Sequence, residues 1–471
     1  MLKKTKIICT MGPATEREGV LDALIANGMN CARFNFSHGT HPEHQERIAA
    51  VREAAKKAGR VISLILDTKG PEMRLGEFAD GKVELTKGET FTLTYADTPG
   101  DATHVAVNHK NLWQEVQPGD TLLLSDGLVA LRVERIDGKD IVTTILNSGP
   151  MSTKKRVAAP GVALGLPPIS EQDEKDIIFG IENDMDFVAA SFIQRPEDVT
   201  ALRDLIKAHG GHMEILPKIE NLEGVKNFDA ILEAADGIMV ARGDLGVEIP
   251  AEEVPLVQKE IIDKCNAAGK PVIVATQMLE SMTSNPRPTR AEASDVANAI
   301  FDGTDAIMLS GETASGDYPV EAVQTMDRIA RRIESSLHYK AIFLDKGVEH
   351  HAMTEAIAHA TVQLSYELDA AVIVTPTESG YTTQMVSKYR PKAAIFAYTP
   401  YERVARHLNL RWGVLPKPAE RLWKDTVAMR RMATTAAKEL GILHPGDVTI
   451  ITSGIKCVPG HTSAIRVYTV K

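Results

Sequence analysis

The sequence predicts a closed (β/α)8 TIM barrel with an inserted small β-barrel domain and a separate C-terminal α/β domain. From residue 5 to about residue 335, short apolar runs rich in Val, Ile and Ala alternate with amphipathic helical patterns, as in a parallel sheet of βα units. The alternation is interrupted once, after residue 67. Beyond about residue 340 a second α/β pattern begins, which indicates another domain.

Eight apolar runs are the candidate barrel strands: 5–9, 30–36, 61–67, 186–192, 213–219, 236–241, 271–276 and 305–309. Eight βα units are the number that closes a barrel. An open, doubly wound sheet could use similar units. Polar residues nevertheless follow many different runs here, which fits a barrel mouth better than the single crevice of an open sheet.

Roughly 100 residues separate Asp67, at the end of the third strand, from a helix expected to begin near Ser170, far more than a usual βα loop contains. Period-two patterns within this segment predict a small β-barrel or sandwich with strands at 82–85, 90–95, 121–124 and 129–133. Above a barrel mouth, such a domain could close as a lid and exclude water. A domain that merely packs there is the alternative.

The C-terminal pattern predicts helices at 353–367, 380–389, 401–408 and 424–440 and strands at 370–375, 394–398, 447–452 and 464–470. We therefore expect four segments: 1–69 and 168–340 for the barrel, 70–167 for the lid and 341–471 for the C-terminal domain.

Composition places the chain among ordinary globular proteins, with 471 residues, 44% hydrophobic and 25% charged. The formal charge of -10 disfavours nucleic acid or an anionic membrane as the main partner. The four cysteines lack zinc or redox spacing and are expected to be reduced thiols. No uncharged apolar run reaches membrane-spanning length. We therefore expect a cytoplasmic protein.

The most informative polar residues follow the fifth and sixth strands. Lys218 and Glu220 are two apart on an extended segment and so point to the same face. Glu220 and Asp244 could hold one divalent ion, because Mg2+ takes few carboxylates and completes its shell with other oxygens. A carboxylate pair could also serve glycoside hydrolysis, but Lys218 would lower the pKa that a general acid needs raised. Gly243 and Asp244 open a turn whose N–H groups could bind a carboxylate or phosphate.

A second polar group follows strands two and three. Asn35, Ser37, Asp67 and the Thr68 carbonyl are hard oxygen donors, and one carboxylate among neutral oxygens could cradle a monovalent cation. Arg33 shares the face of Asn35 and Ser37. Any one of these charged residues could form an ordinary surface ion pair. Their density favours a functional site.

The remaining candidates are weaker when each is taken alone. Thr276 resembles a satisfied loop hydroxyl, and Ser310 with Glu312 lacks the positioned histidine of a serine nucleophile. His38 has no metal-spaced partner and is expected to be a structural hydrogen-bonding residue. Neither G-x-x-x-x-G-K-[ST] nor G-x-G-x-x-G occurs, so a nucleotide would be held through metals, Lys and Arg.

The sequence resembles the pyruvate kinase family in seven motifs that follow the family's order: RFNFSHG (33–39), DTKGPEMR (67–74), KIEN (218–221), GIMVARGDLG (237–246), ATQM (275–278), NPRPTR (285–290) and LSGET (309–313). The resemblance spans the whole chain. The predicted lid and C-terminal domain lie where that family has its B and C domains.

This resemblance implies phosphoryl transfer from phosphoenolpyruvate to ADP, giving pyruvate and ATP in the last step of glycolysis, with Mg2+ (or Mn2+) and K+ as cofactors. Arg33 and Lys218 would hold the moving phosphoryl group, and Lys218 would also stabilise the enolate. Glu220 and Asp244 would bind the divalent ion. The N–H groups of Gly243 and Asp244 would receive the substrate carboxylate.

The resemblance also implies further roles. Thr276, which would contact substrate, would join Ser310 and Glu312 in a water-mediated proton relay to the enolate. Glu72 supports use of K+, since family members that dispense with it carry Lys there. The K+ ligands would be Asn35, Ser37, Asp67 and Thr68, and the nucleotide would meet Asn35, His38, Arg74 and Lys155.

Two regions depart from the family or stay open. The common K-G-V-N-L-P-G at the return from lid to barrel reads K-R-V-A-A-P-G here, with Arg156, Ala158 and Ala159 as the departures, so hinge or lid contacts could differ. A sugar-phosphate effector loop is expected at Thr375, Thr377, Ser379, Gly380 and Thr382, although Glu378 is unfavourable for an anion and a structural loop is the alternative. Lys456 and His461 are the cations in the later loop. The family suggests a homotetramer with allosteric regulation through the C-terminal domain.

Two other classes of function remain. The chain could be a catalytically silent sensor of phosphorylated metabolites, or a metal-dependent aldolase acting on pyruvate-like acids. Intact Lys218, Glu220 and Asp244 argue against the sensor. The lid and the effector-like domain argue against the aldolase.

Overall fold

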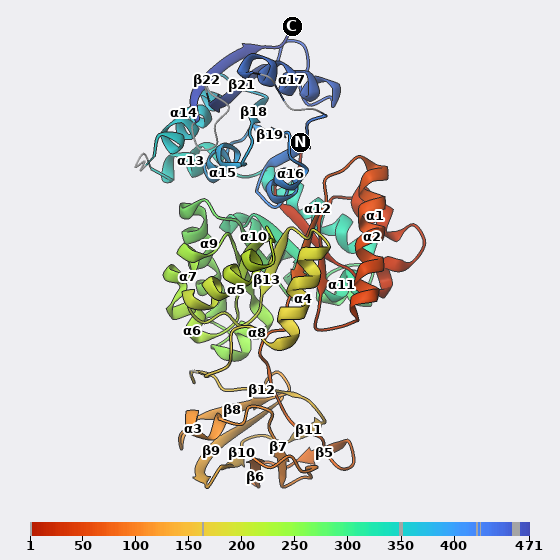
Figure 1. Cartoon of the computed structure of the whole chain (residues 1–471), viewed down its shortest axis with the longest axis vertical. Coiled ribbons are helices and arrows are strands. Elements are labelled where there is room, and N and C mark those ends of the chain that lie inside the picture. Colours follow the sequence, from red (N-terminus) through yellow and green to blue (C-terminus); the bar gives the residue numbers. More distant parts are fainter. Residues whose placement is uncertain (1, 163, 348–351, 421–422, 424, 455–461) are drawn as a thin grey trace.

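The computed structural model describes residues 2–162, 164–347, 352–420, 423, 425–454 and 462–471. Figure 1 shows three bodies along one long axis, with the inserted β domain at one end, the barrel in the middle and the C-terminal domain at the other end. Lys456 and His461, the cations expected in the later C-terminal loop, lie outside the described residues.

The barrel forms as predicted, from eight parallel strands closed in the order β1-β17-β16-β15-β14-β13-β3-β2. Each predicted run overlaps one strand, with ends that differ by one residue in β1 and β2 and by up to two residues elsewhere. Their bounds are β1 Lys6–Thr10, β2 Met29–Asn35, β3 Ser63–Asp67, β13 Phe187–Ala190, β14 Glu214–Ile219, β15 Ile238–Ala241, β16 Val272–Ala275 and β17 Ala306–Leu309.

Helices surround the barrel, and apolar residues on both faces of the strands are buried because side chains fill the interior and pack against the helices outside. Helix α4 begins at a capping box formed by Ser170 and Asp173. The helices are α1 Val20–Ala26, α2 His41–Ala58, α4 Glu171–Glu182, α5 Pro196–Ala208, α6 Leu222–Lys226, α7 Phe228–Ala234, α8 Arg242–Glu248, α9 Val254–Ala268, α10 Arg290–Asp302, α11 Gly311–Ala314 and α12 Pro319–Glu334. Helix α13, Tyr339–Asp345, packs instead with the C-terminal domain.

The inserted domain is a seven-stranded sheet in the order β4-β12-β8-β9-β10-β6-β7, with a two-stranded sheet of β11 and β5. An isolated bridge between Leu75 and Val107 joins the two edges of the larger sheet, which gives it the character of a small barrel. Its elements are β4 Met73–Arg74, β5 Lys82–Leu85, β6 Thr90–Thr94, β7 His104–Ala106, α3 Leu112–Glu115, β8 Thr121–Leu124, β9 Val129–Asp137, β10 Asp140–Ile145, β11 Gly149–Ser152 and β12 Arg156–Ala158.

The C-terminal domain has a five-stranded sheet in the order β20-β19-β18-β21-β22, in which only β22 is antiparallel. The elements of this domain are α14 Met353–Glu367, β18 Val372–Pro376, α15 Tyr381–Lys388, β19 Ala394–Thr399, α16 Glu402–Leu408, β20 Val414–Pro418, α17 Thr426–Glu439, β21 Val448–Gly454 and β22 Thr462–Thr469. The sequence prediction missed β20.

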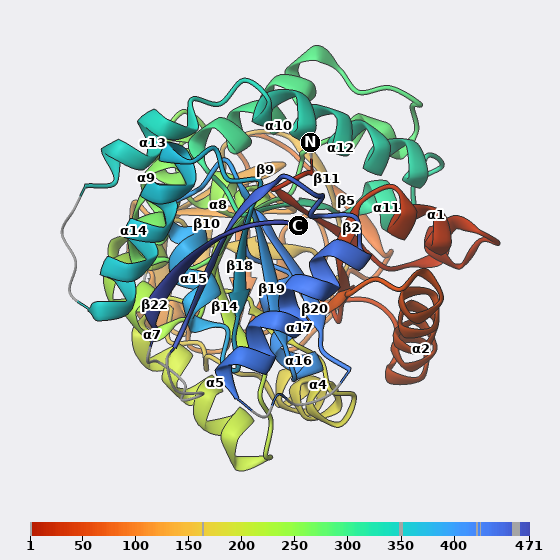
Figure 2. The same ribbon diagram turned by 90° about the horizontal axis from the view of Figure 1, so that it is seen from above.

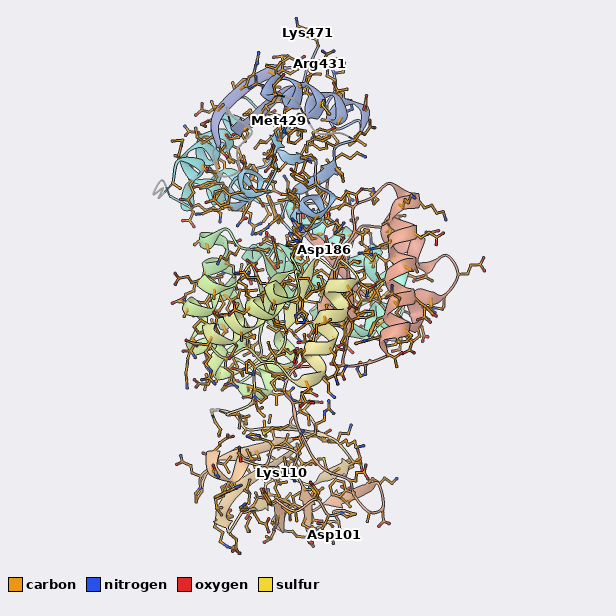
Figure 3. All side chains as sticks on the ribbon, viewed as in Figure 1. Asp101, Lys110, Asp186, Met429, Arg431 and Lys471 are labelled. Atoms are coloured by element: carbon orange, nitrogen blue, oxygen red, sulfur yellow. The ribbon has the colours of Figure 1, made fainter. Side chains whose placement is uncertain are left out.

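The C-terminal domain closes the end of the barrel where the strands begin. Leu410 packs in the cluster that fills the barrel interior, and Arg406 Nε donates to Asp186 Oδ1 at 2.6 Å. Figure 3 places Asp186 at this junction. The other end, where the strands finish, therefore faces the lid. None of the described helices is long and apolar enough to span a bilayer.

Candidate active site

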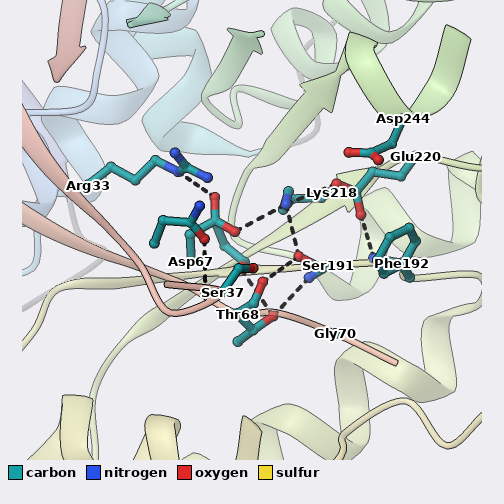
Figure 4. A network of polar contacts seen from close by, with 12 residues as sticks. Arg33, Ser37, Asp67, Thr68, Gly70, Ser191, Phe192, Lys218, Glu220 and Asp244 are labelled. Carbon is teal, nitrogen blue, oxygen red and sulfur yellow. Dashed lines mark hydrogen bonds and ion pairs between the residues drawn. The ribbon is translucent and has the colours of Figure 1, made fainter. Parts of the chain in front are cut away.

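A chain of alternating charges crosses the barrel mouth (Figure 4). Arg33 in β2 donates from Nε to Asp67 Oδ2 at 2.6 Å and from Nη1 to Thr10 Oγ1 at 3.0 Å. The other carboxylate oxygen of Asp67 accepts from Lys218 Nζ at 3.1 Å. Lys218 Nζ lies 2.9 Å from Glu220 Oε1. The structure thus brings together the four charged residues that sequence reasoning placed after strands two, three and five.

The charge states in this chain follow from burial and from neighbouring charges. Burial alone would raise the pKa of Asp67, but Arg33 and Lys218 outweigh it and hold that pKa below its usual value. Burial likewise opposes the charge on Lys218, yet Asp67 and Glu220 together raise its pKa above the ordinary lysine value. Lys218 is therefore a permanent cation, suited to an anionic phosphoryl group rather than to proton transfer.

Ser191 completes this network, and sequence reasoning missed it. It follows β13, and its Oγ accepts from Lys218 Nζ at 2.8 Å while donating to the Thr68 carbonyl at 2.6 Å. Its own N–H donates to Thr68 Oγ1 at 3.1 Å. The available signal was its place directly after an apolar run that ends at the same edge of the barrel as Lys218.

Glu220 and Asp244 fit a divalent cation. Glu220 is fully buried; its Oε2 accepts from Phe192 N at 2.7 Å, and its Oε1 forms the ion pair with Lys218 Nζ. Burial raises the pKa of Glu220 to about 7, and the Asp244 carboxylate beside it adds to the effect although Lys218 opposes it. A buried carboxylate whose pKa stays raised with one lysine beside it can accept a further positive charge.

No group of three or more His, Cys, Asp or Glu side chains among the described residues is arranged to hold a metal ion. Two carboxylates are nevertheless enough for Mg2+, which keeps several waters and takes further oxygens from a substrate. Hard oxygen donors also favour Mg2+ or Mn2+ over softer metals.

The expected K+ residues lie on adjacent strand ends. Asn35 and Asp67 are register partners in β2 and β3, and Asn35 Oδ1 accepts from Ser37 N at 3.1 Å. The Thr68 carbonyl follows Asp67, and Figure 4 shows Ser37, Asp67 and Thr68 close together. The side chains of Asn35, Ser37 and Asp67 and the carbonyl of Thr68 supply hard oxygen donors that could hold a monovalent cation.

Helix α8 begins beside a strained loop. Gly243 and Asp244 lie in its first turn, where N–H groups lack intrahelical acceptors. Thr276 has a φ of 74°, an outlier for a β-branched residue, and Gln277 follows at 57°. A Cβ at Gly243 would lie 2.8 Å from Thr276 Cγ2, so any larger residue here would force the Thr276 side chain to shift. Arg242 Nη2 donates to the Thr276 carbonyl at 2.7 Å and helps to hold the strained conformation.

Glu312 joins two loops of the mouth. It is buried, and its carboxylate accepts from Leu279 N at 3.1 Å and from Ser310 N at 2.6 Å. Burial raises its pKa above the usual glutamate value. These contacts link the loops after β16 and β17, which carry Thr276 and Ser310.

The expected nucleotide residues lie around the mouth on both domains. His38 is exposed, and its carbonyl accepts from the His44 ring at 2.9 Å. Arg74 in β4 donates from Nε to Glu72 Oε2 at 2.9 Å and from Nη1 to the Lys154 carbonyl at 2.9 Å. Lys155, next along the lid, is exposed. Glu72 is therefore engaged by Arg74 from the same segment.

The threonine-rich loop of the C-terminal domain is closely hydrogen-bonded. Thr375 Oγ1 lies 2.8 Å from Thr383 Oγ1, and Thr377 Oγ1 accepts from Gly380 N at 2.9 Å. Thr382 pairs with Thr462, and Glu378 Oε1 accepts from Trp423 Nε1 at 3.3 Å. Ser379 is exposed.

Comparison with known proteins agrees with this geometry. Residues 2–323 match the family model described as pyruvate kinase, barrel domain, and residues 355–468 match pyruvate kinase, alpha/beta domain. A pyruvate kinase from Geobacillus stearothermophilus is 52% identical over 475 residues, covering 100% of this chain and 81% of the relative. One from Clostridium acetobutylicum is 48% identical and covers 100% of both chains.

A solved structure gives the same result. The crystal structure of a pyruvate kinase from Cryptosporidium parvum superposes with a TM-score of 0.95 at 40% identity, covering 100% of this chain and 96% of that one.

Proposed function

The chain belongs to the pyruvate kinase family, and from that membership we propose how its own residues transfer the phosphoryl group of phosphoenolpyruvate to ADP. In this reaction the bond between phosphorus and the enol oxygen breaks, and a bond to a terminal oxygen of ADP forms. The enolate left behind takes a proton at carbon and becomes pyruvate. Members of the family generally use a divalent metal and potassium.

Arg33 and Lys218 hold the transferring group. Phosphoryl transfer depends on positioning and charge neutralisation more than on covalent help, and both cations are fixed by Asp67 before substrate arrives. Lys218, held also by Ser191, stabilises the enolate oxygen as negative charge develops there. A divalent ion on Glu220 and Asp244 would neutralise charge on the substrate oxygens.

The rest of the mouth orients substrate and supplies the proton. The N–H groups of Gly243 and Asp244 bind the substrate carboxylate, and strained Thr276 stands beside them. Thr276 and Ser310 pass a proton through water to the enolate carbon, while Glu312 holds the two loops in place. The nucleotide meets Asn35, His38, Arg74 and Lys155.

One observation carries this proposal: Lys218 lies within hydrogen-bonding or ion-pairing distance of Asp67, Ser191 and Glu220 at the mouth of the barrel. A coupled assay that detects pyruvate tests it, using phosphoenolpyruvate, ADP, Mg2+ and K+. We expect turnover that stops when the divalent metal is removed. Absence of pyruvate at high enzyme concentration would refute the activity.

The proposed K+ site has a separate test. Glu72 pairs with Arg74 beside the mouth, and Glu72→Lys would place a fixed cation there. We expect the variant to keep turnover without K+, whereas the wild type loses most of its activity. Glu77→Lys, an exposed carboxylate of the lid, is the matched control and should leave K+ activation unchanged. Equal K+ activation in Glu72→Lys and wild type would exclude this role for Glu72.

We further propose that the protein acts in the cytoplasm as a homotetramer, with domain boundaries after residues 69, 167 and 340. Sedimentation measures the assembly.

A sugar phosphate would bind the loop of Thr375, Thr377, Ser379, Gly380 and Thr382 and regulate the enzyme. Ser379→Glu, which adds a negative charge at an exposed position, should abolish activation by phosphorylated sugars without changing basal turnover.

A further inference from the structure

Arg156 is a lid residue that reaches into the barrel mouth. It begins β12, opposite Arg74 of β4, and its guanidinium pairs with the carboxylate of Asp244 in helix α8. Its side chain is only 11% exposed, and its guanidinium carbon lies 4.9 Å from the centre of the Phe192 ring. The main chain of the same Phe192 donates to Glu220. A lid strand is thus held against the metal-binding carboxylates.

The surroundings of Arg156 are strongly acidic. Glu72, Phe192 and Glu248 line one pocket with it. Burial would lower the pKa of Arg156, but Asp244, Glu220, Glu72 and Glu248 together raise it. Arg156 is therefore a permanent cation that neutralises carboxylates which a divalent ion would otherwise neutralise.

Asp244 would serve two cations at once. Its Oδ1 accepts from Arg156, and a divalent ion on the Glu220–Asp244 pair would be bound by the same carboxylate, so each cation would weaken the binding of the other. Release of Arg156 would free the strand that leads from the lid back to the barrel. Glu248 stays within the same pocket as an alternative acceptor for the guanidinium.

We propose that Arg156 latches the lid to the mouth by binding Asp244 in competition with the divalent metal, so that metal binding releases the latch. This inference rests on the proposed metal role of Glu220 and Asp244. It assigns to Arg156 a lid contact that the proposed roles of the other site residues do not require.

Mn2+ binding to the metal-free full-length enzyme, without substrates, tests the competition by electron paramagnetic resonance of the free ion. Arg156→Gln should bind Mn2+ about tenfold more tightly than wild type, because the competing ion pair is gone. Arg156→Lys keeps a charge but loses the guanidinium geometry, and should fall between them. Arg135→Gln, an exposed lid arginine paired with Asp137, should bind like wild type.

A structural readout tests release of the latch. In hydrogen exchange, Mn2+ should increase exchange of the amides of β12 and the residues following it in wild type. In Arg156→Gln these amides should exchange rapidly with or without Mn2+. Circular dichroism confirms that each variant is folded, and Arg156→Lys supplies the comparison should Arg156→Gln not fold.

Glu220→Gln distinguishes failure of the metal site from failure of the latch. If Glu220→Gln weakens Mn2+ binding while neither Arg156 variant strengthens it, the metal role stands and the latch is wrong. If Glu220→Gln binds Mn2+ as tightly as wild type, the metal assignment fails and the latch fails with it.

Discussion

The two ends of the barrel both bury lysines, yet they treat the charge in opposite ways. At the mouth, Asp67 and Glu220 overcome burial and raise the pKa of Lys218. At the other end, burial dominates and lowers the pKa values of Lys4 and Lys6 to about 8. The difference arises from the partners, because Lys4 and Lys6 donate chiefly to backbone carbonyls of the C-terminal domain, including Pro391 and Val414.

This contrast separates the candidate active site from a structural contact. We call that contact the joint: it comprises Lys4 and Lys6, which bind the C-terminal domain, and Glu334, which holds their segment. Lys218 is shared between Asp67 and Glu220, and the pKa of Glu220 stays raised although this lysine lies beside it. At the joint, Glu334 accepts from Lys4 N at 2.9 Å and from Thr5 N at 2.7 Å, which satisfies both of its oxygens. The raised pKa of Glu220 leaves the mouth able to bind a further cation, whereas the fully bonded Glu334 holds the segment that carries Lys4 to helix α12.

The largest expected effect is on kcat, and it should appear when Lys218 is replaced but not when Lys6 is. Lys218→Met removes the cation that stabilises the enolate and the moving phosphoryl group, so kcat should fall about a thousandfold or more. Lys6→Met, the matched change at the joint, should keep kcat within a few-fold while changing stability. Coupled kinetics and thermal unfolding measure both. Near-normal turnover in Lys218→Met would remove this residue from the mechanism.

A smaller effect should distinguish two buried glutamates. Glu220→Gln should weaken Mn2+ binding more than tenfold and leave the free energy of unfolding nearly unchanged, because the fold already disfavours the charge on Glu220. Glu334→Gln should leave Mn2+ binding unchanged but cost about 1–3 kcal/mol, since an amide cannot accept as well from Lys4 N and Thr5 N. Equal effects on metal binding would abolish the distinction between site and joint.

The sequence predicted much of both ends, because strand periodicity and strand-end charges are local signals. All eight barrel strands and the network of Arg33, Asp67, Lys218 and Glu220 follow from such signals. Strand β20 was not predicted because Pro416 and Pro418 lie within it, and prolines argue against a central strand. The strand lies at the edge of its sheet, where prolines are tolerated.

Other contacts depend on three-dimensional proximity. Ser191 meets Lys218 only when two barrel strands lie side by side, and Arg156 meets Asp244 only when the lid packs on the mouth. The sequence can place Ser191 at the correct edge of the barrel, but it does not say that Lys218 is its partner, and Arg156 has no such signal. The left-handed conformation of Thr276 is also set by its surroundings, since threonine does not favour that region.

The smallest expected effect is a change with pH in the contribution of Lys6 to the free energy of unfolding. Below about pH 8, Lys6 is charged in both folded and unfolded chains. Between about pH 8 and 10.5 the folded chain has released this proton while the unfolded chain retains it, so Lys6 should contribute increasing stability as pH rises, by about 1 kcal/mol per pH unit. Lys218, whose pKa is raised, cannot contribute such a rise.

Buried cysteines complicate the absolute measurement, because their raised pKa values make stability fall once unfolded thiols ionise. The difference between wild type and Lys6→Met removes this contribution, since both chains keep the cysteines. Denaturant unfolding at pH 7.5, 8.5 and 9.5, values chosen to bracket the pKa of about 8, should show that difference move in favour of wild type as pH rises. Lys82→Met, at an exposed lid position, should show no such movement. A constant difference for Lys6→Met would mean that the joint holds its lysine charged, as the mouth does, and that the contrast between the two ends lies in ligand binding alone.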